Sequence, residues 1–272
     1  MTVLDEIIAH KRAEVVASRA AVPLAEVERR AAAAPRVRGF AAAISGPPVR
    51  LIAEVKRASP SQGAIRPDAD PVALAAAYQE AGAAAVSVLT DRRYFNGSGE
   101  DLQAVRAAIR LPVLRKDFIV DPYQICESRS MGADAVLLIA GTVPREDLTL
   151  LGRLADDLGM TALFEVHSSE QVEEVLDAGA GVIGINNRDL RTLAIDLEMT
   201  ARLRPRIPDG IVVISESGIE TPADVARVCR AGIDAILVGT ALMASPDPAT
   251  QVRVLRLAAE EEGLRLSGGA QR

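Results

Sequence analysis

Eight short apolar runs alternate with helical segments between residues 51 and 239, and this alternation constrains the fold more than any other feature. The runs cover residues 51–56, 85–89, 112–116, 135–139, 161–166, 182–186, 211–216 and 235–239. Near-continuous apolar strands separated by amphipathic helices are typical of a parallel sheet that helices cover on its outer face. The pattern therefore predicts an α/β fold.

An internal repeat favours closure of this sheet into a barrel. Gly82, Gly132, Gly179 and Gly232 each stand in a variant of one phrase, Ala-Gly-Ala-Xaa-Ala-Val, where a helix turns back into a strand. They lie 50, 47 and 53 residues apart, and each interval holds two strand–helix units. Four such quarters predict a (β/α)8 TIM barrel. An open doubly wound sheet is the alternative, but the even spacing of eight units favours the closed form.

The chain of 272 residues is expected to form a single (β/α)8 barrel domain, because a barrel of this class fills about 250 residues. Residues 1–48 are predicted to be an N-terminal helical extension packed on the barrel. Val3, Leu4, Ile7 and Ile8 follow helical spacing, and Pro23 marks the start of a second helix.

Charge and cysteine usage limit the partners and the compartment. The net charge of −6 argues against a nucleic-acid groove or an anionic membrane surface. The longest uncharged run has twelve residues, too few to cross a bilayer, and the first residues lack the order of a signal peptide. Cys126 and Cys229 show no paired spacing. We therefore expect a cytoplasmic protein that is a monomer or a weak homo-oligomer.

Polar residues end five of the apolar runs, where the loops of a barrel converge on one mouth. The chain has 31 basic residues but only three lysines, and two of these fall in this set. Lysine can exchange a proton when its pKa is lowered, whereas arginine effectively cannot. The candidate catalytic residues are Glu54, Lys56, Lys116, Glu165, Asn186 and Glu216, of which the two lysines and three glutamates suit general acid–base work.

The last two units carry a phosphate signal. Ser217 and Gly218 follow the seventh run, and Gly239 and Thr240 follow the eighth. A short helix over residues 240–244 would point its N-terminus into the mouth, which is the usual phosphate site of barrel enzymes. The run 179–184 matches GxGxxG, but a helix precedes it and a strand follows, so we interpret these glycines as helix-end and strand residues.

Several motifs together resemble the indole-3-glycerol-phosphate synthase family. They are Glu-Val-Lys-Arg-Ala-Ser-Pro-Ser at 54–61, Ser-Val-Leu-Thr-Asp at 87–91 with Tyr-Phe-Asn-Gly-Ser at 94–98, Leu-Arg-Lys-Asp-Phe-Ile at 114–119, Glu-Val-His at 165–167, Ile-Asn-Asn-Arg-Asp-Leu at 185–190 and Ser-Glu-Ser-Gly-Ile at 215–219. The resemblance implies a cofactor-free and metal-free carboxy-lyase of tryptophan biosynthesis. Its substrate would be 1-(2-carboxyphenylamino)-1-deoxyribulose 5-phosphate, and its products indole-3-glycerol phosphate, carbon dioxide and water.

The resemblance also implies roles for individual residues. Lys116 would protonate the ketone oxygen, and Glu165 would act in the later dehydration with Glu54 and Lys56 beside it. Asn186 and Glu216 would orient the sugar hydroxyls, and Arg188 with Lys56 would hold the carboxylate. The phosphate would be bound by Ser217, Gly218, Gly239 and Thr240. The aromatic ring would be enclosed by Phe95, Phe118 and Leu138, and Ser59 would be a further binding residue. The N-terminal segment would fold over the mouth.

Two other functions fit a phosphate-binding barrel. Phosphoribosylanthranilate isomerase chemistry would need a Cys/Asp pair at strand ends that carry Glu54, Glu165 and Asn186 here. A sugar-phosphate-binding protein without catalysis would keep the phosphate cradle but would have no reason to hold both Lys116 and Glu165.

Overall fold

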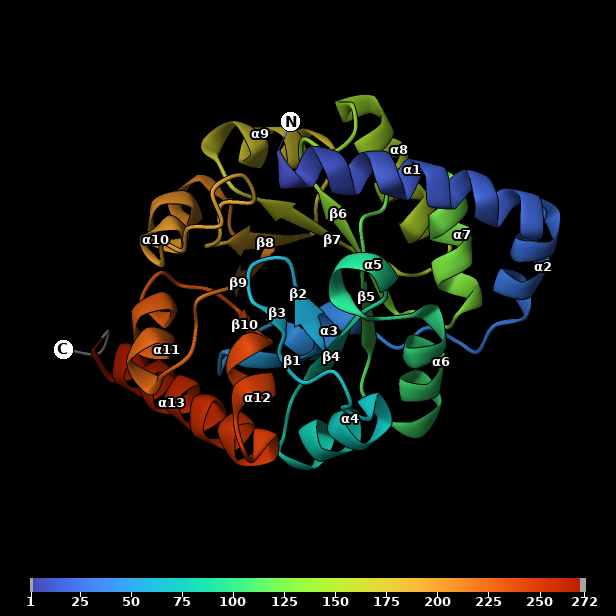
Figure 1. The fold of residues 1–272 in the computed structure, drawn as a ribbon. Helices are drawn as coiled ribbons and strands as arrows, with labels where there is room; N and C mark the ends of the chain where they lie inside the picture. Colours follow the sequence, from blue (N-terminus) through green and yellow to red (C-terminus); the bar gives the residue numbers. More distant parts are fainter. Residues whose placement is uncertain (1, 270–272) are drawn as a thin grey trace.

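The computed structural model describes residues 2–269 and contains a closed barrel of eight parallel strands (Figure 1). The order around the barrel is β1-β10-β9-β8-β7-β6-β5-β4. The strands are β1 (Arg50–Val55), β4 (Ala85–Leu89), β5 (Val113–Lys116), β6 (Ala135–Ile139), β7 (Thr161–Val166), β8 (Val182–Asn186), β9 (Val212–Glu216) and β10 (Ala235–Val238). The predicted (β/α)8 barrel is confirmed, and the doubly wound alternative is excluded.

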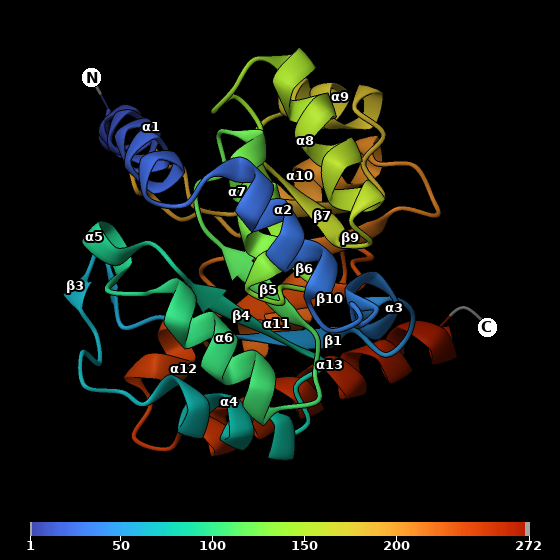
Figure 2. The ribbon, with the colours of Figure 1, turned by 90° about the vertical axis from the view of Figure 1, so that its right-hand side faces the viewer.

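Helices surround the barrel and fill the connections between its strands (Figures 1 and 2). They are α4 (Pro71–Glu80), α5 (Arg92–Phe95), α6 (Gly99–Ala108), α7 (Pro122–Ser130), α8 (Arg145–Asp157), α9 (Ser169–Asp177), α10 (Glu198–Leu203), η1 (Arg204–Arg206), α11 (Pro222–Cys229), α12 (Thr240–Ala244) and α13 (Pro248–Gly269). A small hairpin of β2 (Ala58–Ser59) and β3 (Gly63–Ala64) lies in the loop after β1, and the sequence did not predict it.

Local signals explain where these helices begin and end. Asp70 accepts hydrogen bonds from the first-turn amides of α4, and Asp121 and Thr221 do the same for α7 and α11, each before a proline. The four repeat glycines all adopt positive φ, between 79° and 91°, directly after a helix. The repeated phrase is therefore a helix-stop signal that returns the chain to the barrel.

Three helices precede the first strand: α1 (Val3–Ala21), α2 (Leu24–Ala33) and α3 (Phe40–Ile44). Helix α2 packs on α7, and α1 crosses the end of the barrel where α5 lies (Figures 1 and 2). Helix α3 lies at the opposite end, where Phe40 and Ile44 join the apolar side chains inside the barrel (Figure 2). The barrel interior is thus filled at its amino-terminal end and opens only towards α1.

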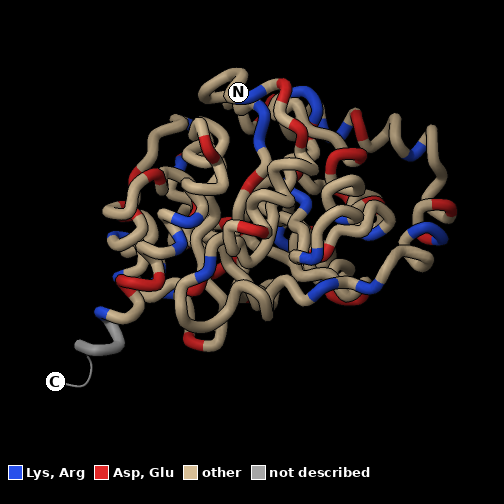
Figure 3. Tube along the Cα trace, turned by 90° about the horizontal axis from the view of Figure 1, so that it is seen from below, with Lys and Arg blue, Asp and Glu red and all other residues tan. Residues whose placement is uncertain are grey.

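The apolar core has two concentric layers. The inner layer includes Ile52, Leu114, Leu163 and Ile214, and the outer layer lies between the strands and the surrounding helices. Acidic and basic residues are interspersed along the chain (Figure 3). Within residues 2–269 no helix is long and apolar enough to span a membrane.

Candidate active site

A cavity of about 150 Å³ opens at the carboxyl ends of the barrel strands, beneath α1. All but one of the residues predicted for the site line it. They are Glu54, Lys56, Ser59, Phe95, Lys116, Phe118, Glu165, Asn186, Arg188, Glu216, Ser217, Gly218, Gly239 and Thr240. The structure therefore brings together residues that lie up to 186 positions apart in the chain.

Leu138 is the exception, and its predicted place at the cavity wall is wrong. It lies in β6 with its side chain in the outer core, fully buried between the sheet and the helices. Its neighbours Leu137 and Ile139 face inward and line the cavity instead. A strand presents successive side chains to opposite faces, so an error of one residue exchanges the two faces.

Lys116, at the end of β5, is at the centre of the polar cluster in the cavity. Its Nζ lies 3.2 Å from Oε2 of Glu165, at the end of β7, and also pairs with Oε2 of Glu216, at the end of β9. Asn186 donates a hydrogen bond of 3.0 Å from Nδ2 to Oε1 of Glu165. One ammonium group is thus held between two carboxylates, and one of these is oriented by an amide.

The two carboxylates that share Lys116 differ in proton affinity. Burial raises the pKa of Glu216 to about 7, because the Lys116 charge offsets the lost hydration only in part and Glu165 adds repulsion. Burial acts the same way on Glu165, but there Lys116, His167 and the Asn186 hydrogen bond prevail and lower its pKa. The pKa of Lys116 is raised, and not lowered as the sequence argument for an exchangeable lysine proton expected, since three carboxylates outweigh its own desolvation. Lys116 therefore carries its proton at neutral pH, and Glu216 is the carboxyl poised to exchange one.

A second ion pair lies on β1 and the residue after it. Nζ of Lys56 is 3.4 Å from Oε1 of Glu54, and Ser87 donates a hydrogen bond of 3.0 Å to the other oxygen of Glu54. This arrangement confirms that the two-residue spacing of Glu54 and Lys56 places both charges on one face.

Two glycines make room for the carboxylates. A Cβ on Gly184 would collide with Oε1 of Glu216, and a Cβ on Gly239 would collide with Oε1 of Glu54. Gly184 belongs to the GxGxxG match, and Gly179, which begins it, ends α9. The interpretation of that match as helix-end and strand glycines is confirmed.

The opposite side of the cavity is built from backbone turns. Ser217 and Gly218 follow β9 with φ of 68° and 76°, and the short helix α12 begins at Thr240 as predicted. Successive left-handed residues and a helix start both direct backbone N–H groups towards one side, which suits an anion.

An apolar wall and roof enclose the remaining sides. The rings of Phe95 and Phe118 lie 6.1 Å apart at an interplanar angle of 40°. Leu4 and Ile7 of α1 and Leu190 of the loop after β8 also line the cavity. The apolar stripe of α1 marked its buried face in the sequence, and this face covers the mouth, as the family resemblance implied.

His167 is a neighbour of the site that sequence reasoning left without a role. Its Nε2 lies 3.4 Å from Oε1 of Glu165, and this contact raises the pKa of His167 against the opposing effect of burial. Cys126 and Cys229 lie in α7 and α11 and do not line the cavity. In the described part of the chain, no group of three or more His, Cys, Asp or Glu is arranged to hold a metal ion.

Comparison with known proteins identifies the family. Residues 4–255 match the family model described as indole-3-glycerol phosphate synthase. The chain belongs to the indole-3-glycerol phosphate synthase family. Curated indole-3-glycerol phosphate synthases from Mycolicibacterium smegmatis and Mycobacteroides abscessus are each 50% identical to it, over 92% and 91% of both chains respectively. The resemblance in the sequence motifs is thereby confirmed.

Solved structures with low sequence identity support the fold alone. A thiamine phosphate pyrophosphorylase from Pyrococcus furiosus matches with a TM-score of 0.62 at 20% identity, over 79% of this chain and 97% of that one. A mandelate oxidase matches with a TM-score of 0.60 at 20% identity, over 80% and 75%. These two matches show that the barrel architecture is shared with proteins of low sequence identity.

Proposed function

We propose that the cavity closes the indole ring of 1-(2-carboxyphenylamino)-1-deoxyribulose 5-phosphate, with Lys116 as general acid. The chain is a carbon–carbon carboxy-lyase of tryptophan biosynthesis, as its family is, and the reaction releases carbon dioxide and water. The observation that supports the assignment is the position of the Lys116 ammonium, held between Glu165 and Glu216 inside the cavity.

Ring closure places negative charge on the ketone oxygen of the substrate as the aryl carbon attacks. The ammonium of Lys116 stabilises this charge and transfers a proton to the oxygen. Carbon dioxide then leaves from the substrate carboxylate, which Lys56 and Arg188 hold. Arg188 is oriented for this role by a hydrogen bond of 2.9 Å from Nη1 to the carbonyl oxygen of Leu193.

Dehydration in the second half of the reaction needs an acid and a base. Glu165 has this role, with Glu54 and Lys56 beside it, while Asn186 and Glu216 orient the sugar hydroxyls. The raised pKa of Glu216 gives the pair a carboxyl that can carry a proton near neutral pH. No step is assigned to a cofactor or a metal.

The rest of the cavity binds the two ends of the substrate. Ser217, Gly218, Gly239 and Thr240 hold the phosphate, and Ser59 lies at the edge of the loop after β1. The aromatic ring packs against the wall formed by Phe95 and Phe118, with Leu137 and Ile139 at the positions facing the cavity on β6. Helix α1 covers the bound ring.

We also propose that the chain acts as one barrel domain with residues 1–48 as its extension. We expect it to work in the cytoplasm as a monomer or weak homo-oligomer, without nucleic acid. The net charge of −6 and the interspersed charges support this proposal (Figure 3). Analytical ultracentrifugation over a range of protein concentrations tests the oligomeric part.

A direct assay tests the proposed reaction. The purified protein is given the carboxyphenylamino-deoxyribulose phosphate in the presence of a chelator, and indole fluorescence is followed. The chain contains no tryptophan, so indole emission reports the product alone. Absence of turnover by folded protein would overturn the proposal.

The phosphate cradle has its own test. Thr240→Asp introduces a negative charge at the start of α12, so KM is expected to rise at least tenfold with a smaller change in kcat. Thr240→Ser keeps the hydroxyl and serves as the matched control. An unchanged KM in Thr240→Asp would place the phosphate elsewhere.

A further inference from the structure

The third lysine of the chain lies outside the catalytic cluster and is more deeply buried than the two lysines in the cavity. Lys11 belongs to α1 and is 5% exposed. Its Nζ lies 2.8 Å from Oδ2 of Asp91, 2.9 Å from Oδ1 of Asp117 and 2.6 Å from Oε2 of Glu14. Two of these carboxylates belong to the loops after β4 and β5, so Lys11 joins the N-terminal helix to two barrel loops.

Asp91 and Asp117 organise the loops that carry the aromatic wall. Asp91 accepts a hydrogen bond of 2.7 Å from the backbone N–H of Tyr94 and thereby caps α5, which ends at Phe95. Asp117 stands between Lys116 and Phe118 and accepts a hydrogen bond of 2.8 Å from the Phe118 amide. The two partners of Lys11 are therefore next to residues that line the cavity.

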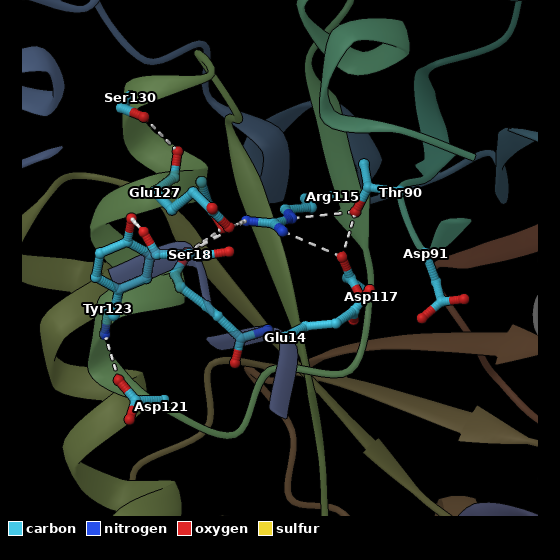
Figure 4. Close-up of polar contacts among 12 residues, drawn as sticks. Glu14, Ser18, Thr90, Asp91, Arg115, Asp117, Asp121, Tyr123, Glu127 and Ser130 are labelled. Carbon is cyan, nitrogen blue, oxygen red and sulfur yellow. Dashed lines mark hydrogen bonds and ion pairs between the residues drawn. The ribbon is translucent and has the colours of Figure 1, made fainter. Parts of the chain in front are cut away.

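A polar network fixes Asp117 from the other side (Figure 4). Arg115 donates to Oδ2 of Asp117 at 3.1 Å and to Oγ1 of Thr90 at 3.1 Å, and Thr90 donates to the same Asp117 oxygen at 2.6 Å. Arg115 also pairs with Glu127 of α7 at 2.9 Å. Asp117 thus has a fixed position, and Lys11 ties α1 to that fixed point.

The same face of α1 forms the roof of the cavity. Leu4, Ile7 and Lys11 are spaced by three and four residues, which places them on one side of the helix. Leu4 and Ile7 line the cavity, while Lys11 reaches the two loop carboxylates one turn further along. Lys11 therefore ties the cavity-lining face of α1 to the loops beneath it.

We propose that Lys11 is a positioning residue of the active site, which fastens the roof helix to the loops bearing Phe95, Phe118 and Lys116. This inference rests on the function proposed above. It assigns Lys11 to enclosure of the substrate, since the residue does not touch the reacting atoms. Loss of its ammonium removes the buried tie between α1 and these two loops and leaves Asp91 without a cation, while Asp117 keeps Arg115.

The chemistry of the site explains why lysine stands here in a chain that otherwise uses arginine. Three carboxylate oxygens lie within 2.6 to 2.9 Å of one nitrogen, a compact arrangement that suits the point charge of an ammonium group. A guanidinium is planar and spreads its donors over a fork, so it cannot direct them to one point. We expect Lys11→Arg to restore only part of the wild-type behaviour.

The test separates substrate enclosure from catalysis. In Lys11→Met, KM for the substrate is expected to rise about tenfold or more, with kcat within about threefold of wild type, because Lys116 keeps Glu165 and Glu216. The Kd for indole-3-glycerol phosphate, measured by the change in its indole emission, is expected to rise in parallel. A KM and Kd within twofold of wild type in folded Lys11→Met would overturn the inference.

Arg106→Met is the matched control for loss of a buried ion pair. Arg106 pairs at 2.8 Å with Asp134, which directly precedes β6 at the other end of the barrel. We expect this variant to lower Tm while leaving KM unchanged. An equal rise in KM in Arg106→Met would mean that general destabilisation, and not the roof, governs binding, and would also overturn the inference.

Two further variants complete the design. Lys11→Met with Asp91→Asn removes a cation and an anion together, and Asn retains an oxygen to cap α5. If the only role of Lys11 were to neutralise Asp91, the double variant would have the KM of wild type. If Lys11 fastens the roof helix, the double variant keeps the raised KM of Lys11→Met. Should Lys11→Met not fold, Asp91→Asn alone removes one contact, and an unchanged KM there would refute the inference. Wild-type turnover, measured first, tests the proposed function independently.

Discussion

Two clusters in this molecule each consist of a lysine among carboxylates, but the pKa of a carboxyl group is lowered in one and raised in the other. Lys116 and Lys11 are both buried lysines beside carboxylates at the carboxyl ends of the strands. Lys11 contacts three carboxylates, and its partner Asp117 has Arg115, Thr90 and a backbone amide as well. Lys116 has two direct carboxylate contacts and faces the catalytic cavity, and Oε1 of Glu216 has no hydrogen-bond partner among the described residues.

The difference appears in the proton affinities of the carboxylates. The pKa of Asp117 falls to about 2, since Arg115 and Lys11 together overcome the effect of burial. The pKa of Glu216 rises to about 7, since burial and the neighbouring Glu165 prevail over one shared ammonium. The two cations beside Asp117 hold it in its charged form, whereas the one ammonium that Glu216 shares with Glu165 leaves a group that exchanges protons and an oxygen available to a ligand.

The largest expected effect is on the catalytic lysine. Lys116→Met removes the acid that protonates the ketone oxygen, so kcat should fall by about 10²-fold or more while the Kd for indole-3-glycerol phosphate changes little. Lys11→Met should instead raise KM and the Kd for indole-3-glycerol phosphate while kcat changes little. Steady-state kinetics measure kcat and KM, and titration with the product measures Kd. Near-normal turnover of Lys116→Met would show that the Lys116 cluster is not catalytic and so does not differ from the Lys11 cluster in this way.

The two clusters should also respond oppositely to pH. Folded Glu216 holds a proton above its ordinary pKa of about 4.5, so its contribution to the free energy of unfolding is present below that value and is lost as pH rises through about 7. Wild type should therefore lose about 2 kcal/mol relative to Glu216→Gln between pH 5 and pH 8. Urea denaturation at the two pH values measures this difference.

Asp117 supplies the comparison at lower pH. Its pKa is depressed, so its contribution is present above its ordinary value of about 4 and is lost as pH falls towards about 2. Asp117→Asn should leave the change between pH 5 and pH 8 as in wild type. An identical change in wild type and Glu216→Gln would show that Glu216 does not hold a proton near neutrality.

Much of the fold could be predicted from the sequence. Strands that are buried on both faces consist almost entirely of apolar residues, so they appear in the sequence as apolar runs. Each observed strand end lies within one residue of its prediction, and the polar residues at those ends meet in one cavity. The same uniform hydrophobicity hides which face a residue takes, which is why Leu138 was misplaced.

Other features depend on distances that no local pattern contains. Asp91 and Asp117 lie 80 and 106 residues after Lys11, and only the folded loops bring them to its nitrogen. The scarcity of lysine marked Lys11 as unusual without naming its partners. Similarly, Glu165 and Glu216 end equivalent strands. Burial raises both pKa values, but Lys116, His167 and the Asn186 hydrogen bond prevail at Glu165, whereas at Glu216 burial and repulsion from Glu165 prevail over Lys116.

The smallest effect is expected from a single methyl group beside Glu216. A Cβ on Gly184 would meet Oε1 of Glu216, the far end of a movable side chain, so Gly184→Ala should displace the carboxylate with little loss of stability. We expect kcat to fall about tenfold, or about 1.4 kcal/mol in the barrier, with Tm nearly unchanged. Gly181→Ala is the control, since nothing lies within 4 Å of its Cβ position. A lowered Tm with normal kcat in Gly184→Ala would show instead that the position of Glu216 serves the fold, as that of Asp117 does.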